Sequence, residues 1–303
     1  MYDSGGFTGM MCKKNSTVGD ILFDIVVTFV MAVVVIISLY PFLYIIFYSF
    51  SNSALLGTGL LLYPKGFNVD AYKVLISDEK IPHALFISVA RSIISPACSL
   101  MVNSLAAFAL SHHHFMGRSF ILRFLTITMY FSSGLIPYYI LMMKLHLTNT
   151  FLVYVVPSLF SAFDLILIKT YMESLPAALE ESAMIDGASY FKTFFRIILP
   201  LCKPVLAALL LFNCVGQWNS YSDTMIYNAT RTDLHTLSYV LMNFIQTSTS
   251  TAEAARQQAG LMTVNTTSLK MAMTVITVIP IMCVYPFLQK YFAKGLLIGS
   301  VKG

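Results

Sequence analysis

The sequence predicts an all-α, polytopic membrane protein with six transmembrane helices. Of its 303 residues, 57% are hydrophobic and only 11% are charged, whereas soluble domains usually carry about 25% charged residues. A helix needs roughly 20 apolar residues to cross a bilayer core of about 30 Å, and the chain holds six such runs. Runs this continuously apolar favour helices over the alternating strands of a barrel.

Each apolar run is expected to form one span. The runs lie near residues 25–50, 84–110, 119–143, 150–170, 200–220 and 268–290. The first is too long for the apolar core of a cleaved signal peptide, about 7–15 residues, and shows no small-residue cleavage site. In the third, "SSGLIPYYI" is expected to break the helix with Gly134 and Pro137. Residues 21–294 are therefore predicted to form the transmembrane domain, between an N-terminal segment 1–20 and a C-terminal tail 295–303.

The distribution of basic residues predicts the orientation. With six spans both termini share a side, and placing them inside puts eleven Lys and Arg residues in the inner segments and seven in the outer ones. This bias favours cytoplasmic termini in a cell membrane. The remaining basic residue, Arg91, lies within the second span, where it either snorkels or bonds a backbone carbonyl. The basic residues form no stripe, so no nucleic-acid partner is expected.

Two outer segments, 51–83 and 221–267, carry features of their own. Residues 69–76 have the spacing of a short amphipathic helix that lies at the membrane interface. The segment 221–267 is rich in Ser and Thr, and its "STSTAEAARQQAGL" has the pattern of a helix start. A loop of this length is more often functional than idle.

Several polar or reactive side chains allow two interpretations. The triplet His112-His113-His114 has no neighbouring carboxylate or cysteine, which favours an ordinary cytoplasmic loop over a metal site. Asp24 and Asp164 lie in spans, where bonding to neighbouring helices is favoured over proton coupling. The five cysteines lack metal-ligand spacing and are predicted to be free.

The segment 174–200, "SLPAALEESAMIDGASYFKTFFRIILP", is polar and jointed between apolar runs. Ser174 is expected to cap a short helix, in which Glu180 and Glu181 favour the dipole of the first turns. Gly187 ends or bends that helix. A second, aromatic-rich helix then runs from Ala188 to the fifth span. The expected product is an elbow on the cytoplasmic face, which either rests on headgroups or contacts another protein.

The spacing within this elbow resembles a known motif. The spacing runs Glu181-Ser182-Ala183, three residues, Gly187, nine residues, Ile197, one residue and then Leu199-Pro200. It resembles the EAA loop of the permease subunits of bacterial ABC importers, with Ser182 in place of the middle Ala. The resemblance covers nearly the whole chain. "GLIPYYILMMKLHLTNTF", "WNSYSDTMIY" and the terminal "YFAKGLLIGSVKG" resemble the carbohydrate branch, which includes the maltose-type second permease and the Gram-positive polysaccharide and complex-oligosaccharide permeases.

This resemblance implies a type I ABC importer permease fold and a division of labour. The chain would be no enzyme and would bind no cofactor or metal, because ATP and Mg²⁺ would be held by two partner ATPase subunits. The absence of a GxxxxGK[ST] stretch agrees. The other partners implied are a second homologous permease in a heterodimer, an extracellular solute-binding lipoprotein and an oligosaccharide. The residues that would couple to the ATPase are Glu181, Ser182, Ala183, Asp186, Gly187, Ile197, Leu199 and Pro200.

A sugar path needs aromatic rings and hydrogen-bonding groups at membrane depth. The candidates are Asn103, Tyr138, Asn213, Gln217, Trp218, Asn219 and Tyr221. The alternative for any one of them is structural, with Trp218 in the interfacial belt and the amides bonding neighbouring helices.

Two other functions remain open at this stage. An ABC importer permease for an amino acid or peptide would keep the elbow and change the cargo. An ion-coupled secondary transporter would leave the elbow without a purpose. The C-terminal tail either frays in the cytoplasm or reaches an ATPase interface, as it does in the maltose-type relatives.

Overall fold

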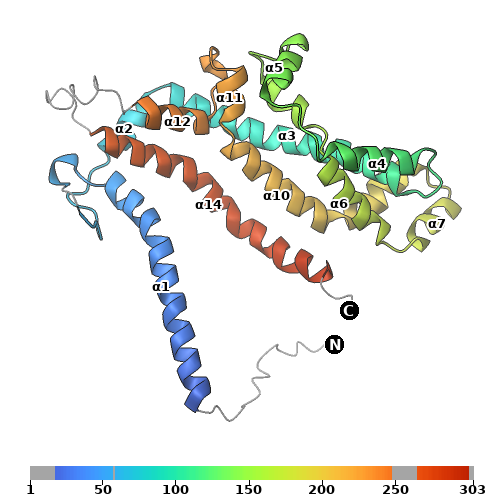
Figure 1. The fold of residues 1–303 in the computed structure, drawn as a ribbon, viewed down its shortest axis with the longest axis horizontal. Helices are drawn as coiled ribbons and strands as arrows, with labels where there is room; N and C mark the ends of the chain where they lie inside the picture. Colours follow the sequence, from blue (N-terminus) through green and yellow to red (C-terminus); the bar gives the residue numbers. More distant parts are fainter. Residues whose placement is uncertain (1–17, 57–58, 248–264, 300–303) are drawn as a thin grey trace.

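The computed structural model describes residues 18–56, 59–247 and 265–299, which form helices and short connections (Figure 1). Within these residues there is no strand, and one isolated antiparallel bridge joins Ser51 to Phe67. The all-α prediction is confirmed. The α-helices of five residues or more are α1 (Val18–Ser49), α2 (Asp70–Ser77), α3 (Lys80–Ser111), α4 (Arg118–Thr128), α5 (Leu135–Lys144), α6 (Ala162–Glu173), α7 (Ala178–Ile185), α10 (Lys203–Asn219), α11 (Ser222–Tyr227), α12 (Leu237–Thr247) and α14 (Thr266–Gly299).

Shorter helical turns connect these elements. Several of them lie inside apolar runs, so they bend the chain where a straight span was expected. They are η1 (Ser53–Leu55), η2 (Phe151–Tyr154), η3 (Val156–Ser158), α8 (Tyr190–Thr193), the π-helical turn η4 (Phe194–Ile198), α9 (Leu199–Leu201) and η5 (Thr232–Leu234).

Three described helices are by themselves long and apolar enough to cross a membrane: Leu22–Ser49, Lys80–Ser111 and Thr266–Cys283. Two bent pairs raise this number to as many as five. One joins Phe151–Ser158 to Ala162–Glu173 at 47°, and the other joins Tyr190–Leu201 to Lys203–Asn219 at 76°. The predicted total of six spans remains a prediction.

The predicted third span, residues 119–143, consists of two helices, α4 and α5. Gly134 lies at the break with φ of 77°, a left-handed conformation that suits glycine, so the predicted break is confirmed there. Pro137 lies inside α5 instead of at the break, where its missing N–H falls in the first turn and costs no hydrogen bond.

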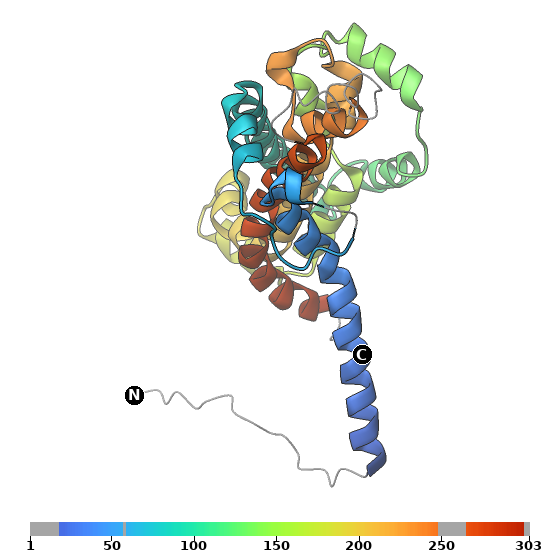
Figure 2. The same cartoon turned by 90° about the vertical axis from the view of Figure 1, so that its left-hand side faces the viewer.

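The body of the molecule is built around α3. Helices α10 and α6 pack along it, and α14 crosses α10 and meets α12, α2 and α1 (Figures 1 and 2). A core at the elbow end joins α3, α6 and α10 and contains Ala107, Phe108, Ile168, Phe194 and Ile198. A second core at the opposite end of α3 joins α2, α12 and α14 around Leu75, Trp218, Leu237, Ala272 and Met273.

Helix α1 projects from this body (Figure 2). No residue of its most apolar window is buried within the chain, and Phe23, Phe29, Ile36 and Ile37 are each more than 60% exposed. An apolar surface of this extent needs lipid or another apolar protein surface around it.

The two segments predicted to lie outside the membrane agree in part with the sequence-based expectations. Helix α2 confirms the predicted amphipathic helix; Leu75 is buried against the body, while Val74 and Ile76 stay exposed. The helix start predicted in "STSTAEAARQQAGL" lies outside the described residues. At the C-terminus, α14 continues to Gly299, five residues into the predicted tail, and residues 300–303 lie outside the described residues.

Candidate functional site

The predicted elbow is built by a local helix-stop signal. Helix α7 ends at Ile185, and Gly187 follows with φ of 72°. The Gly187 N–H donates to the Met184 carbonyl at 3.0 Å, and the Ala188 N–H donates to the Ala183 carbonyl at 2.9 Å. These two bonds form a Schellman motif, which requires a left-handed residue at the position of Gly187. Ser189 then caps α8 by accepting from the Lys192 N–H.

The beginning of the elbow differs from the prediction. Ser174 closes α6 instead of starting α7, and its Oγ donates to the Tyr171 carbonyl at 2.7 Å. Ala177 precedes α7 with no side-chain cap. Ser174 can serve only one helix end, and the i−3 carbonyl of α6 lies within its reach.

The coupling candidates divide into an exposed set and an anchored set. Glu181, Ser182, Asp186 and Gly187 are exposed on the elbow. Ala183 is 5% exposed, so its small side chain permits close packing within the chain and not at the outer face. Ile197, Leu199 and Pro200 are half-buried, and the first two pack on the core at the elbow end.

Two large apolar side chains that were not among the sequence-based candidates also lie exposed on the elbow. Ile185 is 86% exposed, and Phe191 on α8 is 71% exposed. The sequence signal that could have selected them was their position on either side of the Gly187 turn. Large apolar side chains exposed on an otherwise polar elbow indicate a contact surface.

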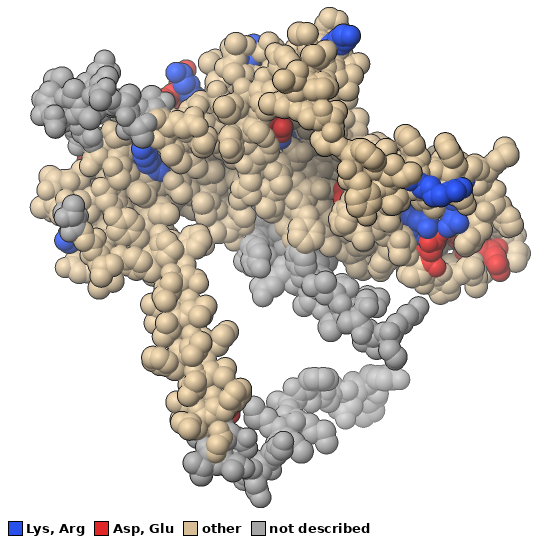
Figure 3. Space-filling model, viewed as in Figure 1, with Lys and Arg blue, Asp and Glu red and all other residues tan. Residues whose placement is uncertain are grey.

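Charged groups hold the base of the elbow. Glu173 accepts from Arg118 of α4 and from Lys169 of α6, the latter at 2.8 Å. In the space-filling view, charged side chains gather at the end of the molecule that carries α4 and α7 (Figure 3). A cavity of about 830 Å³ opens beside them, between the end of α3, α7 and α8.

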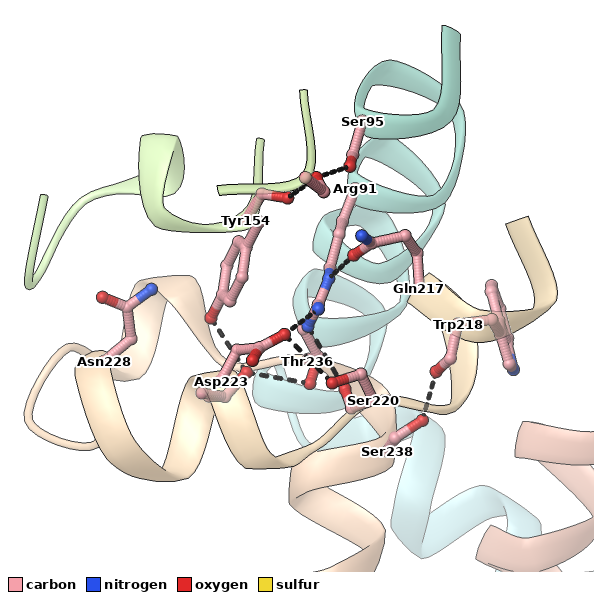
Figure 4. A network of polar contacts seen from close by, with 12 residues as sticks. Arg91, Ser95, Tyr154, Gln217, Trp218, Ser220, Asp223, Asn228, Thr236 and Ser238 are labelled. Atoms are coloured by element: carbon pink, nitrogen blue, oxygen red, sulfur yellow. Dashed lines mark hydrogen bonds and ion pairs between the residues drawn. The ribbon is translucent and has the colours of Figure 1, made fainter. Parts of the chain in front are cut away.

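The other end of α3 carries a buried polar network around Arg91 (Figure 4). Arg91 is 1% exposed, and its guanidinium pairs with the Asp223 carboxylate. Its Nε donates to Gln217 Oε1 at 2.6 Å and its Nη1 to the Ser220 carbonyl at 3.2 Å. These partners satisfy the desolvated cation, which would otherwise be costly. Arg91 therefore joins α3 to the end of α10 and to α11.

Tyr154 completes this network from η2. The guanidinium carbon of Arg91 lies 4.5 Å from the centre of its ring, a cation–π contact. The Tyr154 hydroxyl donates to the Leu234 carbonyl at 2.7 Å and lies 2.9 Å from Thr224 Oγ1. Sequence reasoning missed Tyr154 and Asp223; the only available signal was that an intramembrane Arg requires a partner.

The path candidates fall into four groups. Trp218 is buried in the core, and its indole N–H donates to the Thr277 carbonyl of α14 at 3.1 Å. It is therefore not free to stack on a solute in this structure, and it is a core residue instead of the interfacial belt residue of the structural alternative. Gln217 accepts a hydrogen bond from Arg91 through its side-chain oxygen. The exposed candidates are Tyr138, Asn219 and Tyr221.

The remaining two candidates bond neighbouring helices. Asn103 is fully buried; its Nδ2 donates to the Leu159 carbonyl at 3.2 Å and its Oδ1 accepts from the Ser161 N–H. Asn213 Nδ2 donates to Asp164 Oδ2 at 2.7 Å. The expectation that Asp164 bonds within the helix bundle is confirmed.

The described residues contain no group of three His, Cys, Asp or Glu side chains placed to hold a metal. His112 instead approaches Glu180, with Nε2 3.2 Å from Oε2. Cys98, Cys202, Cys214 and Cys283 are free thiols, as predicted, and Cys12 lies outside the described residues.

A helical membrane body with broken spans and an exposed elbow defines the membrane-spanning subunit of a transporter. Residues 99–298 match the family described as the binding-protein-dependent transport system inner membrane component. The chain belongs to this family.

The relatives are similar along nearly the whole chain. Protein LplC of Bacillus subtilis (strain 168) is 37% identical, over 88% of this chain and 90% of its own. The polygalacturonan/rhamnogalacturonan transport system permease protein YtcP of the same organism is 34% identical, over 93% of this chain and 99% of its own.

A solved structure, that of a bacterial ABC transporter involved in the import of the acidic polysaccharide alginate, contains a similar chain. It superimposes with a TM-score of 0.83 at 26% identity, over 91% of this chain and 98% of that chain. This likeness confirms the predicted type I permease fold.

Family membership decides between several of the alternatives. The chain is a permease subunit of an ABC importer, and ATP hydrolysis belongs to separate ATPase subunits. The ion-coupled secondary transporter is excluded. The family works with a solute-binding protein and lies in the membrane.

Proposed function

We propose that this chain is one half of the membrane pore of an ATP-driven importer for oligosaccharides, which an extracellular solute-binding protein delivers. The observation that carries this proposal is the elbow: a Schellman turn at Gly187 that presents Glu181, Ser182 and Asp186 outward on a chain of the binding-protein-dependent family. The family defines the class of transporter, and the elbow is the part of the chain on which ATP hydrolysis acts.

The elbow couples ATP hydrolysis to the spans. Glu181 pairs with a basic residue of an ATPase subunit, and Ile185 enters an apolar contact on it. ATP and Mg²⁺ are held by two such subunits. Phe194 and Ile198 are each 1% exposed in the core at the elbow end, so movement of the elbow is passed rigidly into α3, α6 and α10. ATP-driven closure then shifts the population between outward-open and inward-open states.

The complex contains a second, homologous permease. The exposed apolar surface of α1 supports this arrangement, because a heterodimer covers it in part while lipid covers the rest. Both termini lie in the cytoplasm, on the side of the elbow.

The cargo is a carbohydrate. This assignment rests on the named cargo of the relatives, which includes polygalacturonan and rhamnogalacturonan and, for the 29% identical permease AraQ of Halalkalibacterium halodurans, arabinooligosaccharides. Tyr138 and Tyr221 are 37% and 38% exposed and offer ring faces for a pyranose, with Asn219 as a hydroxyl partner. Trp218 is buried in the core with α12 and α14.

ATP hydrolysis by the reconstituted complex, with its binding protein, tests the cargo class. A panel of oligosaccharides is compared with a matching panel of amino acids and peptides. Stimulation by particular oligosaccharides supports the proposal. Stimulation only by amino acids or peptides would keep the elbow's role and replace the carbohydrate with the other cargo.

A further inference from the structure

Residues 59–67, in the connection between α1 and α2, lie beside the C-terminal end of α1 (Figure 1). The connection is closed at its base, because Ser51 and Phe67 form the antiparallel bridge. Further along it, the Leu61 N–H donates to the Tyr40 hydroxyl of α1 at 3.3 Å. Residues 59–67, named the α1 loop below, therefore have a fixed place against this helix.

The bond to Tyr40 indicates how deep the α1 loop lies in the membrane. The apolar helix Leu22–Ser49 has 28 residues, so it is about 42 Å long, close to the thickness of a bilayer with its headgroups. Tyr40 lies nine residues before Ser49, which is about 14 Å along the axis at 1.5 Å per residue. Because a span of this length ends among the headgroups, a group at the level of Tyr40 lies at or below their boundary with the hydrocarbon.

The side chains of the α1 loop have the composition of a membrane interface. Four large apolar side chains are each at least 66% exposed, namely Leu60, Leu62, Tyr63 and Phe67. Lys65 is also exposed, and it is the only charged residue within the sequence range 25–69. Leaving such apolar surface in water is costly. A lipid interface accommodates leucine side chains, a tyrosine ring and a lysine whose ammonium reaches the headgroups.

Contacts within the chain brace the α1 loop. Leu61 packs inward and is 5% exposed. Phe67 stacks on Phe50 with the ring centres 5.6 Å apart. Gly66 has φ of 60°, and a Cβ there would meet Leu55 Cδ1 at 2.6 Å, so this turn requires glycine. Large apolar side chains that stay exposed on a braced loop indicate a contact surface.

The partner that fits this surface is the lipid bilayer. The α1 loop adjoins α1, whose most apolar window has no residue buried within the chain, so the two apolar surfaces are continuous. A water-soluble protein would find few hydrogen-bonding groups here, since Tyr63 and Lys65 are the only residues of the loop with polar side chains, and protein interfaces usually hold several direct hydrogen bonds.

We propose that the α1 loop is an interfacial anchor, in which Leu60, Leu62 and Tyr63 insert among the lipids at the C-terminal end of α1. The anchor fixes the depth of this end of the helix in the bilayer. The inference needs only that α1 crosses the membrane, and it is independent of the proposed cargo and of the proposed ATPase contact.

A photo-crosslinking residue at position 62 tests the inference in the complete importer. The importer is reconstituted in liposomes of phosphatidylethanolamine and phosphatidylglycerol whose acyl chains carry an alkyne tag. Position 62 should give a tagged lipid adduct, and its yield should not fall when the solute-binding protein is added. The matched control is position 232, because Thr232 is also exposed but lies between the charged residues Arg231 and Asp233. It should give no tagged adduct.

Two results would overturn the inference. One is an adduct of position 62 with the solute-binding protein or with the second permease, and the other is a lipid yield from position 62 no higher than that from position 232. If the variant at position 62 does not assemble, position 60 decides, because Leu60 is 78% exposed and its replacement disturbs no core packing. Failure of the proposed function looks different: no ATPase subunit co-purifies, while the lipid adduct from position 62 still forms.

Discussion

The guanidinium of Arg91 lies 4.5 Å above the ring of Tyr154 while it pairs with the carboxylate of Asp223. One side chain of α3 thus contacts the end of α10, the start of α11 and the turn η2. Arg91 lies in the first half of α3 and His112 caps its C-terminal end, so one helix, which contains Pro96, runs between this network and the elbow.

Removing one partner of the Arg91–Asp223 pair should strongly destabilise the chain. Asp223→Ala leaves a cation in a site that is 1% exposed, and stranding a buried charge costs about 3–5 kcal/mol. The double variant Arg91→Met with Asp223→Ala should lose less than Asp223→Ala alone. Thermal unfolding in detergent measures both. Equal losses in the single and double variants would contradict the assignment.

The pair Arg231–Asp233 is the matched control for that experiment. Both side chains are exposed, and hydrogen bonds from Arg231 hold the pKa of Asp233 at about 2. A lowered carboxylate pKa contributes stability above the ordinary value near 3.8 and loses it as pH falls toward 2. Because both side chains are exposed and water screens the pair, this contribution is small, and Arg231→Ala should leave the unfolding temperature at pH 7 nearly unchanged. It should also show no pH dependence of its own between pH 5 and 8.

Gly187→Ala should uncouple transport from ATP hydrolysis. An added Cβ at Gly187 meets nothing within 4 Å, so the strain comes only from its φ of 72°, which costs an L-residue about 1–2 kcal/mol. Gly187→Asn should recover part of the coupling, since Asn tolerates this conformation. Gly19→Ala, which has open space and no positive φ, is the control. Solute transported per ATP is the measurement; wild-type coupling in Gly187→Ala would contradict the turn's role.

Ile185→Asp should abolish co-purification of the ATPase subunits while the chain remains folded. The side chain is 86% exposed, so the substitution costs little within the chain and places a charge in the proposed apolar contact. Met116→Asp is the control, because Met116 is 93% exposed in the connection between α3 and α4 and lies outside the elbow. Retention of the ATPase by Ile185→Asp would remove Ile185 from the contact.

Variants at Trp218 and at Tyr221 should have different effects, the first on stability and the second on transport. Trp218→Phe keeps most of the buried ring and loses the bond to the Thr277 carbonyl, for an expected loss of about 1 kcal/mol. Its solute specificity should stay unchanged. Tyr221→Ala, at a site 38% exposed, should weaken transport of the oligosaccharide with little effect on the unfolding temperature. A changed solute specificity in Trp218→Phe, with unchanged transport in Tyr221→Ala, would contradict this and make Trp218 a residue of the solute path.

The sequence could predict the elbow because its signals are local. Gly187 needs only its own φ, and the bonds that define the turn join residues three and five apart. The bends within the predicted spans were harder. The hydropathy of residues 150–170 is continuous, yet packing against α3 folds it into η2, η3 and α6. The partner of Arg91 could not be derived at all, since Asp223 lies 132 residues away and no periodicity connects them.

The most direct test of the account places a photo-crosslinking residue at position 185 in the assembled importer and at position 116 as the control. The account predicts a covalent adduct with an ATPase subunit from position 185, with a yield that changes when ATP is trapped in the complex, and none from position 116. Adducts only with lipid from position 185, in a complex that still hydrolyses ATP, would contradict the claim that the elbow is where the ATPase engages this chain.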